Sequence, residues 1–263
     1  MIKVNGNAVK LGQFPDGTFL LKGNIDFNSE VTITWKYEND AETLALIYLT
    51  KHIRAHGTEK IHLDMPYIPN ARQDRVKTAE DVFTLKYFAE IINSLEFASV
   101  TVLDPHSSVS EALIDRIIIK TPQKYIHSVM KKVGNENLLM FYPDEGAMKR
   151  YSAMSQLPYV FGIKKRDWTT GKINSLDVSG NTELINGRNI LIVDDICSRG
   201  GTFYHSAIKL KELGADKIYL FISHCENTIL QGELLTSGLI ERVFTTDSIF
   251  TEKNEKIEVL DYE

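Results

Sequence analysis

Two adjacent carboxylates and a glycine-rich loop lie within the stretch ILIVDDICSRGGTF, residues 190–203. Asp194 and Asp195 follow four apolar residues that favour a β-strand, and paired carboxylates suit the two vicinal hydroxyls of a ribose. The loop that follows carries the residues whose hydroxyls, cation and backbone N–H groups could bind a phosphate: Ser198, Arg199, Gly200, Gly201 and Thr202. The alternative is an acidic strand end followed by an ordinary helix cap.

A basic pair lies in the stretch GIKKRDWTTGK, where Lys164 and Arg166 are two residues apart. In an extended chain the two side chains would share one face, because side chains alternate along a strand. Two cations at a strand end would stabilise the negative charge of a transferring phosphoryl group. Considered alone, the pair also fits a solvated surface.

Three residues at predicted strand ends could contact Mg²⁺ or the phosphates that it holds. Asp104 and His106 lie two apart in TVLDPHSS, and Asp144 ends the strand in FYPDEGAMKR. Carboxylate oxygens suit Mg²⁺, which is the metal we expect. A turn before Pro105 explains the first pair equally well, and a helix N-cap explains Asp144.

The stretch MPYIPNARQDR places further polar residues after a predicted strand. Arg72 could form a bidentate contact with phosphate oxygens, and Gln73 could contact a base or sugar edge. Considered alone, the stretch fits a solvated polar loop better. Near the N-terminus, turns at Asn5-Gly6 and around Asp16 predict short strands and a hairpin tip that carries Phe14.

The elements that must position these residues alternate between strand and helix, which favours parallel sheets. Strands are predicted at 60–69, 98–106, 137–146, 159–167, 190–195 and 217–224, and helices at 41–57, 81–95, 147–157, 203–215 and 226–238. The alternation restarts near Tyr125. The fold class is therefore α/β, in two similar halves.

Composition bounds the kind of protein. The chain has 263 residues, a hydrophobic content of 43% and a net charge of −5, so we expect a full core and no nucleic-acid partner. The two cysteines, Cys197 and Cys225, show no metal-ligand spacing, and no apolar run is long enough for a membrane span. We expect a soluble, cytoplasmic protein without a membrane partner. Cys197 is either a reactive thiol or a small core filler.

Together, these motifs resemble those of the ribose-phosphate diphosphokinases, the synthetases of phosphoribosyl pyrophosphate (PRPP). The matching runs are FPDG, PYIPNARQD, LDPHSS, PDEGAMKR, IKKR, VDDICSRGGT and TTDSI, in family order. The resemblance implies two phosphoribosyltransferase-like domains, each a mainly parallel sheet flanked by helices, at 1–121 (ATP side) and 122–263 (ribose-phosphate side). It also implies Mg²⁺-dependent transfer of the β,γ-diphosphate of ATP to the anomeric hydroxyl of ribose 5-phosphate, with release of AMP.

The resemblance further implies a role for each candidate residue. Lys164 and Arg166 match the catalytic Lys-x-Arg. The ATP-binding set is Phe14, Asp16, Arg72, Gln73 and His106, with Phe14 and Asp16 reaching from a neighbouring subunit of a dimer or hexamer. The Mg²⁺ set is Asp104, His106 and Asp144. The ribose-phosphate set is Asp194, Asp195, Ser198, Arg199, Gly200, Gly201 and Thr202.

The chain departs from the family pattern at several positions. Thr18 stands where the family usually has Glu, and Ser198-Arg199 stands where it has Asp-Thr. Arg199 would suit a second phosphate, so ADP-ribose is an alternative acceptor, as in PRPP-synthetase-like enzymes of phage NAD⁺ salvage. An inactive regulatory subunit is also compatible with the resemblance, although the retained Lys164 and Arg166 disfavour it. A phosphoribosyltransferase shares the Asp-Asp loop, but the two-domain length disfavours it.

Overall fold

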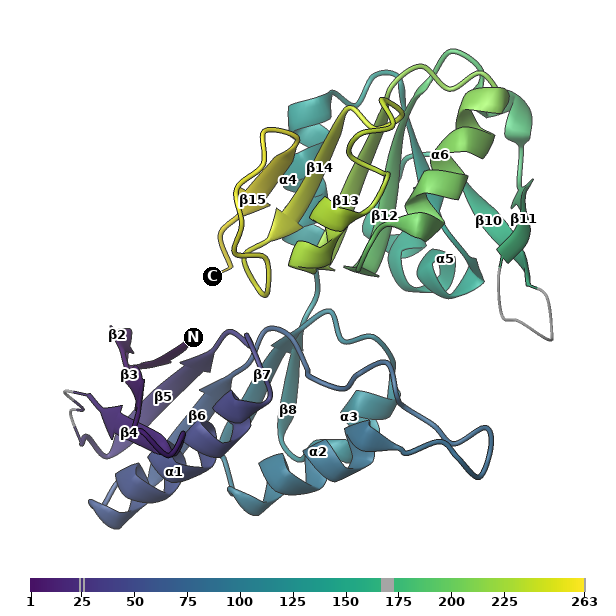
Figure 1. Ribbon diagram of the computed structural model, residues 1–263. Helices are drawn as coiled ribbons and strands as arrows, with labels where there is room; N and C mark the ends of the chain where they lie inside the picture. The colour runs from purple at the N-terminus through teal and green to yellow at the C-terminus, as the bar shows by residue number, and fades with distance from the viewer. Residues whose placement is uncertain (24, 26, 167–172, 263) are drawn as a thin grey trace. The chain divides into compact units, whose positions relative to one another are not determined.

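The chain forms two compact α/β units, Met1–Thr121 and Pro122–Glu263, in a computed structural model (Figure 1). The structure describes residues 1–23, 25, 27–166 and 173–262, with the backbone alone for 164–166 and 173–176. Each unit contains one mainly parallel sheet with helices, which confirms the predicted fold class. No helix in these ranges is both long enough and apolar enough to span a membrane.

The sheet of the first unit has the order β2 (Asn7–Ala8), β1 (Ile2–Val4), β5 (Glu30–Trp35), β6 (Lys60–Asp64), β7 (Ser99–Leu103) and β8 (Ile117–Lys120). Strands β5 to β8 are parallel, and β1 is antiparallel to both of its neighbours. In β5, Val31, Ile33 and Trp35 are buried whereas Glu30 and Thr32 are exposed. This alternation packs one face of the strand into the core.

The parallel strands of this unit are connected through the helices α1 (Ala41–Ala55), α2 (Thr84–Ser94) and α3 (Val109–Leu113). The inward faces of α1 and α2 are aliphatic and aromatic, with Leu46, Ile53, Phe88 and Ile92 all buried. A separate hairpin of β3 (Lys10–Gln13) and β4 (Phe19–Lys22) carries the tip that contains Phe14.

The sheet of the second unit has the order β11 (Ile173–Ser179), β10 (Tyr159–Arg166), β9 (Leu138–Tyr142), β12 (Asn189–Cys197), β13 (Ile218–Cys225), β14 (Arg242–Thr246) and β15 (Ile257–Leu260). The edge strand β11 is antiparallel to its neighbour, and the strands from β10 to β15 are parallel. All five residues of β9 are buried, as is typical of a strand covered on both faces.

The helices of this unit are α4 (Gln123–Val133), α5 (Glu145–Tyr151) and α6 (Gly201–Glu212), with short 3₁₀ helices η1 (Ser152–Met154), η2 (Thr182–Ile185) and η3 (Asn227–Gln231). As Figure 1 shows, α5 and α6 directly follow the strands β9 and β12. Their N-termini therefore belong to the same edge of the sheet as the strand ends.

One predicted helix is wrong. Of residues 226–238, only Asn227–Gln231 is helical, as the 3₁₀ helix η3. Gly232 ends it in an extended conformation, with φ −93° and ψ 170°. The buried residues Leu234 and Leu235 follow the buried Ile229 by five and six positions, and not by the three or four that place side chains on one face of a helix.

Candidate functional site

The acidic strand end lies on β12, which pairs with β9 and β13 inside the parallel sheet of the second unit. Asp195 is 6% exposed, and its Oδ2 lies 3.3 Å from a guanidinium nitrogen of Arg150, at the end of α5. Asp194 is half-buried, and its Oδ1 accepts a hydrogen bond of 3.0 Å from the backbone N–H of Asp195. The carboxylate charge of Asp195 is thus balanced from the neighbouring βα connection.

Arg150 is a site residue that the sequence interpretation missed. It lies at the end of the run PDEGAMKR, two turns after the strand end at Asp144, and its guanidinium also lies over the ring of Tyr151 at 5.7 Å. A cation at the end of a helix usually complements the helix dipole. Because this ordinary role explains Arg150, the sequence gives no sign of its contact with Asp195. That contact arises from the packing of α5 beside β12.

The loop between β12 and α6 leads into a helix N-terminus, where anions often bind. Gly200 is in the left-handed region, with φ 80°, and is the N-cap of α6. It has no side chain with which to cap the helix, so the first N–H groups of α6 are left to water or to an anion. Ser198 and Thr202 are half-buried, and Arg199 is exposed. Ser198 and Arg199 lie in the bend before Gly200, and Thr202 lies in the first turn of α6.

Cys197 immediately precedes this loop and belongs to the core. Its side chain is 1% exposed, and it pairs in register with Cys225 of β13. A hydrogen bond with Cys225 and burial raise the pKa of the Cys197 thiol well above its ordinary value. A neutral buried thiol is a poor nucleophile, so Cys197 is a core residue and not a reactive thiol.

The basic pair Lys164 and Arg166 lies at the end of β10, the neighbour of β9. The pairing with β11 places Lys164 opposite Leu176 and Arg166 opposite Ile173, with a register shift between Lys165 and Arg166. Such an irregularity changes the simple alternation from which a shared face was predicted. The side chains of both residues lie outside the part of the chain that the structure describes.

Asp144 lies between β9 and α5 and is the N-cap of that helix. Its Oδ1 accepts a hydrogen bond of 3.0 Å from the backbone N–H of Ala147. The N-cap interpretation is therefore correct, and it leaves a ligand role open because a carboxylate has several lone pairs. Burial raises the pKa of the neighbouring Tyr142 to about 12, which keeps that phenol neutral.

In the first unit, the loops after β6 and β7 lie next to each other. Asp74 is buried and receives two hydrogen bonds from Arg75, of 2.7 and 2.9 Å. These bonds lower the pKa of Asp74, and the nearby His106 lowers it as well. Arg72 is exposed, and the Gln73 side chain accepts a hydrogen bond of 2.9 Å from Thr84. Arg72, Gln73 and His106 thus belong to two adjoining loops.

Asp104 has an unusual backbone. It is 3% exposed and has a φ of 40°, in the left-handed region that a residue with a Cβ rarely adopts. Its backbone N–H bonds to the carbonyl of Lys120 at 3.0 Å, which ties the end of β7 to the end of β8. Strained backbone of this kind recurs at ligand sites, where the fold holds a side chain in a set orientation.

The hairpin tip exposes an aromatic ring. Phe14 is 48% exposed, and its backbone N–H bonds to the carbonyl of Thr18 at 2.9 Å. Asp16 accepts bonds from the N–H and the hydroxyl of Thr18, at 3.0 and 2.7 Å, and these bonds lower its pKa. The tip is therefore an ordered turn that presents an apolar ring to its surroundings.

Within the described residues, no group of three His, Cys, Asp or Glu side chains is arranged to hold a metal ion. Asp104 and His106 lie in the first unit and Asp144 lies in the second, and each carboxylate is of the type that Mg²⁺ prefers. This ion keeps several waters and commonly takes one or two carboxylates together with substrate phosphates. A complete cage of protein ligands is not required.

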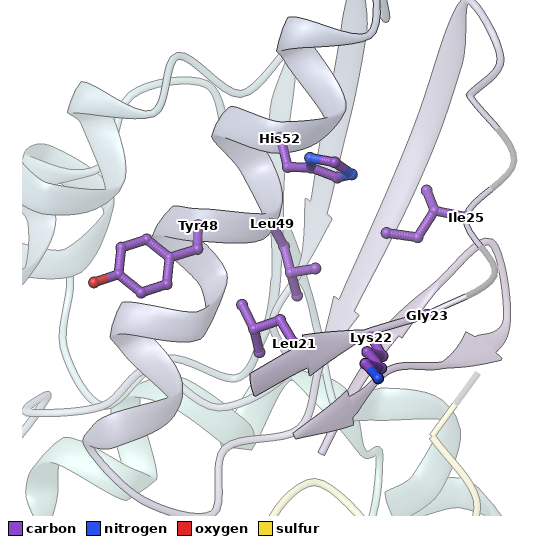
Figure 2. Close-up of a pocket in the computed structure, with 7 residues that line it drawn as sticks. All are labelled: Leu21, Lys22, Gly23, Ile25, Tyr48, Leu49 and His52. Carbon is purple, nitrogen blue, oxygen red and sulfur yellow. The ribbon is translucent and has the colours of Figure 1, made fainter. Parts of the chain in front are cut away.

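A pocket of about 610 Å³ lies between the hairpin and α1 in the first unit (Figure 2). It is lined by Leu21, Lys22, Gly23, Ile25, Tyr48, Leu49 and His52. These described lining residues include none of those that the sequence singled out for chemistry. The lining is mainly apolar, whereas the residues described above at the strand ends of the two sheets are mainly polar.

No protein-family model matches the chain. It is 30% identical over 258 residues to a ribose-phosphate pyrophosphokinase of Thermoplasma volcanium, covering 91% of this chain and 86% of the relative. It is 28% identical over 240 residues to the protein of that name from Thermococcus kodakarensis, covering 89% and 81%. A phosphoribosylpyrophosphate synthetase structure from Mycobacterium smegmatis has the same fold, with a TM-score of 0.81 at 17% identity, covering 97% of this chain and 86% of that one.

Proposed function

The chain belongs to the ribose-phosphate pyrophosphokinase family and is a diphosphotransferase, and from this premise we propose that it transfers the β,γ-diphosphate of ATP to the anomeric hydroxyl of ribose 5-phosphate. The products are PRPP and AMP. The observation that carries the proposal is the edge formed by β12 and α6. There, two carboxylates precede a left-handed glycine and the first turn of a helix. This order provides acceptors for sugar hydroxyls and donors for a phosphate next to each other.

In this proposal Asp194 and Asp195 accept hydrogen bonds from the 2- and 3-hydroxyls of the ribose. Residues 198–202 bind the 5-phosphate through backbone N–H groups and hydroxyls. The guanidinium of Arg150, 3.3 Å away, places a positive charge beside the carboxylate of Asp195. An ionised carboxylate has only acceptors, so it matches the hydroxyl donors of the sugar.

The first unit would bind ATP. Arg72 and His106 contact the phosphates, and Gln73 contacts the nucleoside. Phe14 and Asp16 hold the adenine of a neighbouring subunit, so the active species is a homo-oligomer, a dimer or a hexamer. The exposure of Phe14, at 48%, supports this role, because a ring at a hairpin tip can stack on a base only if it is not buried in its own subunit.

The residues that would contact Mg²⁺ or the ATP oxygens around it are Asp104 and His106 in the first unit and, taken separately, Asp144 in the second. When bound, Mg²⁺ would neutralise the charge of the transferring diphosphate. The N-cap bond orients the carboxylate of Asp144, and Asp104 lies at a turn with a left-handed backbone. Lys164 and Arg166 would stabilise the charge that develops as the anomeric oxygen attacks the β-phosphorus in line and AMP departs.

ADP-ribose is a second acceptor that one observation favours. Arg199 is exposed within the phosphate loop, where its guanidinium can reach a phosphate beyond the 5-position. In that case the product is ADP-ribose 1-pyrophosphate, and Arg199→Thr would lower kcat/KM for ADP-ribose more than for ribose 5-phosphate. No product from ADP-ribose, or the same ratio of the two kcat/KM values in wild type and Arg199→Thr, would contradict this role of Arg199.

The experiment that tests the proposal incubates the protein with ATP, Mg²⁺ and each of several ribose phosphates. Equal amounts of AMP and pyrophosphorylated sugar are expected. Release of pyrophosphate from added PRPP and a base would point to a phosphoribosyltransferase. Binding of ATP without turnover would point to an inactive regulatory subunit. The buried free thiols fit the reducing cytoplasm, which is the location we propose.

A further inference from the structure

The loop that precedes α6 rests on a second segment, residues 226–234, far along the chain. The backbone N–H of Glu226 donates a hydrogen bond of 2.8 Å to the carbonyl of Cys197. Beyond η3, Gly232 packs against Arg199 and Leu234 packs against Gly200. The segment that was expected to be a helix therefore contacts the end of β12 at Cys197 and the phosphate loop at Arg199 and Gly200.

The contact at Gly232 leaves no room for a side chain. A Cβ built on Gly232 would lie 1.9 Å from the carbonyl oxygen of Arg199 and 2.9 Å from its carbonyl carbon. Both are backbone atoms, so they cannot move aside as the end of a flexible side chain can. Any residue other than glycine must displace the loop, the 226–234 segment, or both.

The backbone conformation of Gly232 gives no other reason for a glycine. Its φ of −93° and ψ of 170° are allowed to every residue with a side chain. The glycines at 200 and 238 differ, since their φ values of 80° and 72° already favour glycine. Glycine is required at position 232 only because a side chain has no room there. The atom that fills this room is the carbonyl oxygen of Arg199, in the phosphate loop.

The contact at Gly200 adds a second restraint. A Cβ there would lie 2.9 Å from Cδ2 and 3.1 Å from Cβ of Leu234. Leu234 is 1% exposed and is fixed in the core of the second unit. The Arg199 carbonyl and the Gly200 backbone are thus both held by residues that lie outside the loop and its helix.

We propose that Gly232, with Leu234, is a positioning residue for the acceptor's phosphate. Its contact with Arg199 fixes the position of the Ser198–Gly201 backbone relative to the sheet, and therefore the direction in which the N–H groups of that backbone point. This inference rests on the proposed function, because it assumes that the loop binds the 5-phosphate. N–H donors bind an anion only at hydrogen-bond distance and angle, so a loop displaced by a fraction of an ångström loses several bonds together.

The test compares Gly232→Ala with Gly238→Ala, a control in the same connection. A Cβ at Gly238 would meet no atom within 4 Å, although its positive φ makes alanine strained there. Gly238→Ala therefore measures the effect of a lower folding stability when no new atom collides with the phosphate loop. For Gly232→Ala we expect the dissociation constant and KM for ribose 5-phosphate to rise by about tenfold or more, with KM for ATP within about twofold of wild type. In Gly238→Ala, the dissociation constant and KM for ribose 5-phosphate and the KM for ATP should all stay at their wild-type values.

A second pair of variants covers the case in which Gly232→Ala does not fold. Leu234→Ala removes the support under Gly200, and Leu235→Ala truncates the adjacent buried leucine, which makes neither loop contact. We expect the two variants to have similar melting temperatures, because each truncates one buried leucine. Only Leu234→Ala should weaken the binding of ribose 5-phosphate. Equal acceptor affinity in wild type, Gly232→Ala and Leu234→Ala would overturn the inference.

Calorimetric titration with ribose 5-phosphate separates this inference from the proposed function. If wild-type protein binds the sugar phosphate but releases no AMP, the proposed function fails while the binding constants still decide the role of Gly232. If wild-type protein releases AMP and Gly232→Ala binds the sugar equally well, only the inference fails. If wild-type protein does not bind the sugar phosphate, both fail.

Discussion

Asp195 and Arg150 form an ion pair at the edge of the sheet where we propose that the ribose binds. Asp195 is almost completely buried, and an unpaired buried carboxylate would tend to protonate. The guanidinium 3.3 Å away opposes this tendency. Because a protonated acid would present a donor to the sugar hydroxyls, Arg150 protects the acceptor character on which the proposed ribose contact depends.

Lys164 and Arg166 are the residues whose removal should affect the chemical step most. In either alanine variant we expect kcat to fall by about 100-fold or more, with KM for ATP changed by only a few-fold, because each cation stabilises charge that develops in the transition state. Steady-state AMP release measures both constants. Lys165→Ala is the matched control on the same strand and should stay near wild-type turnover. Near wild-type turnover in both test variants would remove them from the catalytic assignment.

The thiols of Cys197 and Cys225 should resist labelling in the native protein. Both are buried, and the raised pKa of Cys197 keeps that thiol neutral at pH values where an exposed thiol begins to ionise. Labelling with a chromogenic disulfide reagent should be complete only in denaturant. Rapid modification of one thiol in the folded protein would contradict the assignment of Cys197 to the core.

The same thiol should give stability a dependence on alkaline pH. The folded-state pKa of Cys197 is raised above the unfolded value, so its stabilising contribution is full below about pH 8.5 and is lost as pH rises further. Denaturant midpoints for wild type and Cys197→Ala should therefore converge between neutral and alkaline pH. A constant difference between them would mean that the thiol does not titrate differently in the two states.

At the scale of elements, the β12–α6 unit was predictable because its signals are local. A run of apolar residues, two carboxylates, two glycines and an amphipathic helix follow one another within one stretch, and the structure has that order. The support from residues 226–234 was not predictable in this way. Gly232 has an ordinary φ, so nothing in its neighbourhood shows that its missing Cβ makes room for Arg199.

The hairpin of β3 and β4 should contribute to ATP binding. Phe14→Ala should raise KM for ATP by about fivefold or more and leave KM for the acceptor unchanged, because stacking of an aromatic ring on a base is worth about 1–3 kcal/mol. Phe27→Ala is the control, since Phe27 is also exposed, at 41%, but stacks on His56 with ring centroids 4.2 Å apart. An unchanged KM for ATP in Phe14→Ala would mean that the hairpin tip does not contact the nucleotide.

At the scale of the whole molecule, strand and helix alternate in both units, and this alternation was visible in the sequence. The boundary between the units carries little signal, because β8 ends at Lys120 and α4 begins at Gln123 without a linker. The polar edges were visible as residue types at strand ends. Their detailed contacts, such as Arg150 with Asp195, depend on packing between elements and could not be predicted.

The two units should take part in one coupled reaction that needs both. Unit Met1–Thr121 carries the proposed ATP contacts, and unit Pro122–Glu263 carries the ribose-phosphate contacts. A substitution in the phosphate loop should then raise the KM for the acceptor, and a substitution of Arg72 should raise the KM for ATP. The chain is a diphosphotransferase by family, so what requires testing is the pairing of donor and acceptor.

The most direct test follows AMP and PRPP together after mixing the protein with ATP, Mg²⁺ and ribose 5-phosphate. We expect that the two products appear in equal amounts, that omission of the sugar phosphate abolishes AMP formation, and that Asp194→Asn lowers both in parallel. Formation of ADP in place of AMP, or of AMP without the sugar phosphate, would contradict the proposed diphosphate transfer.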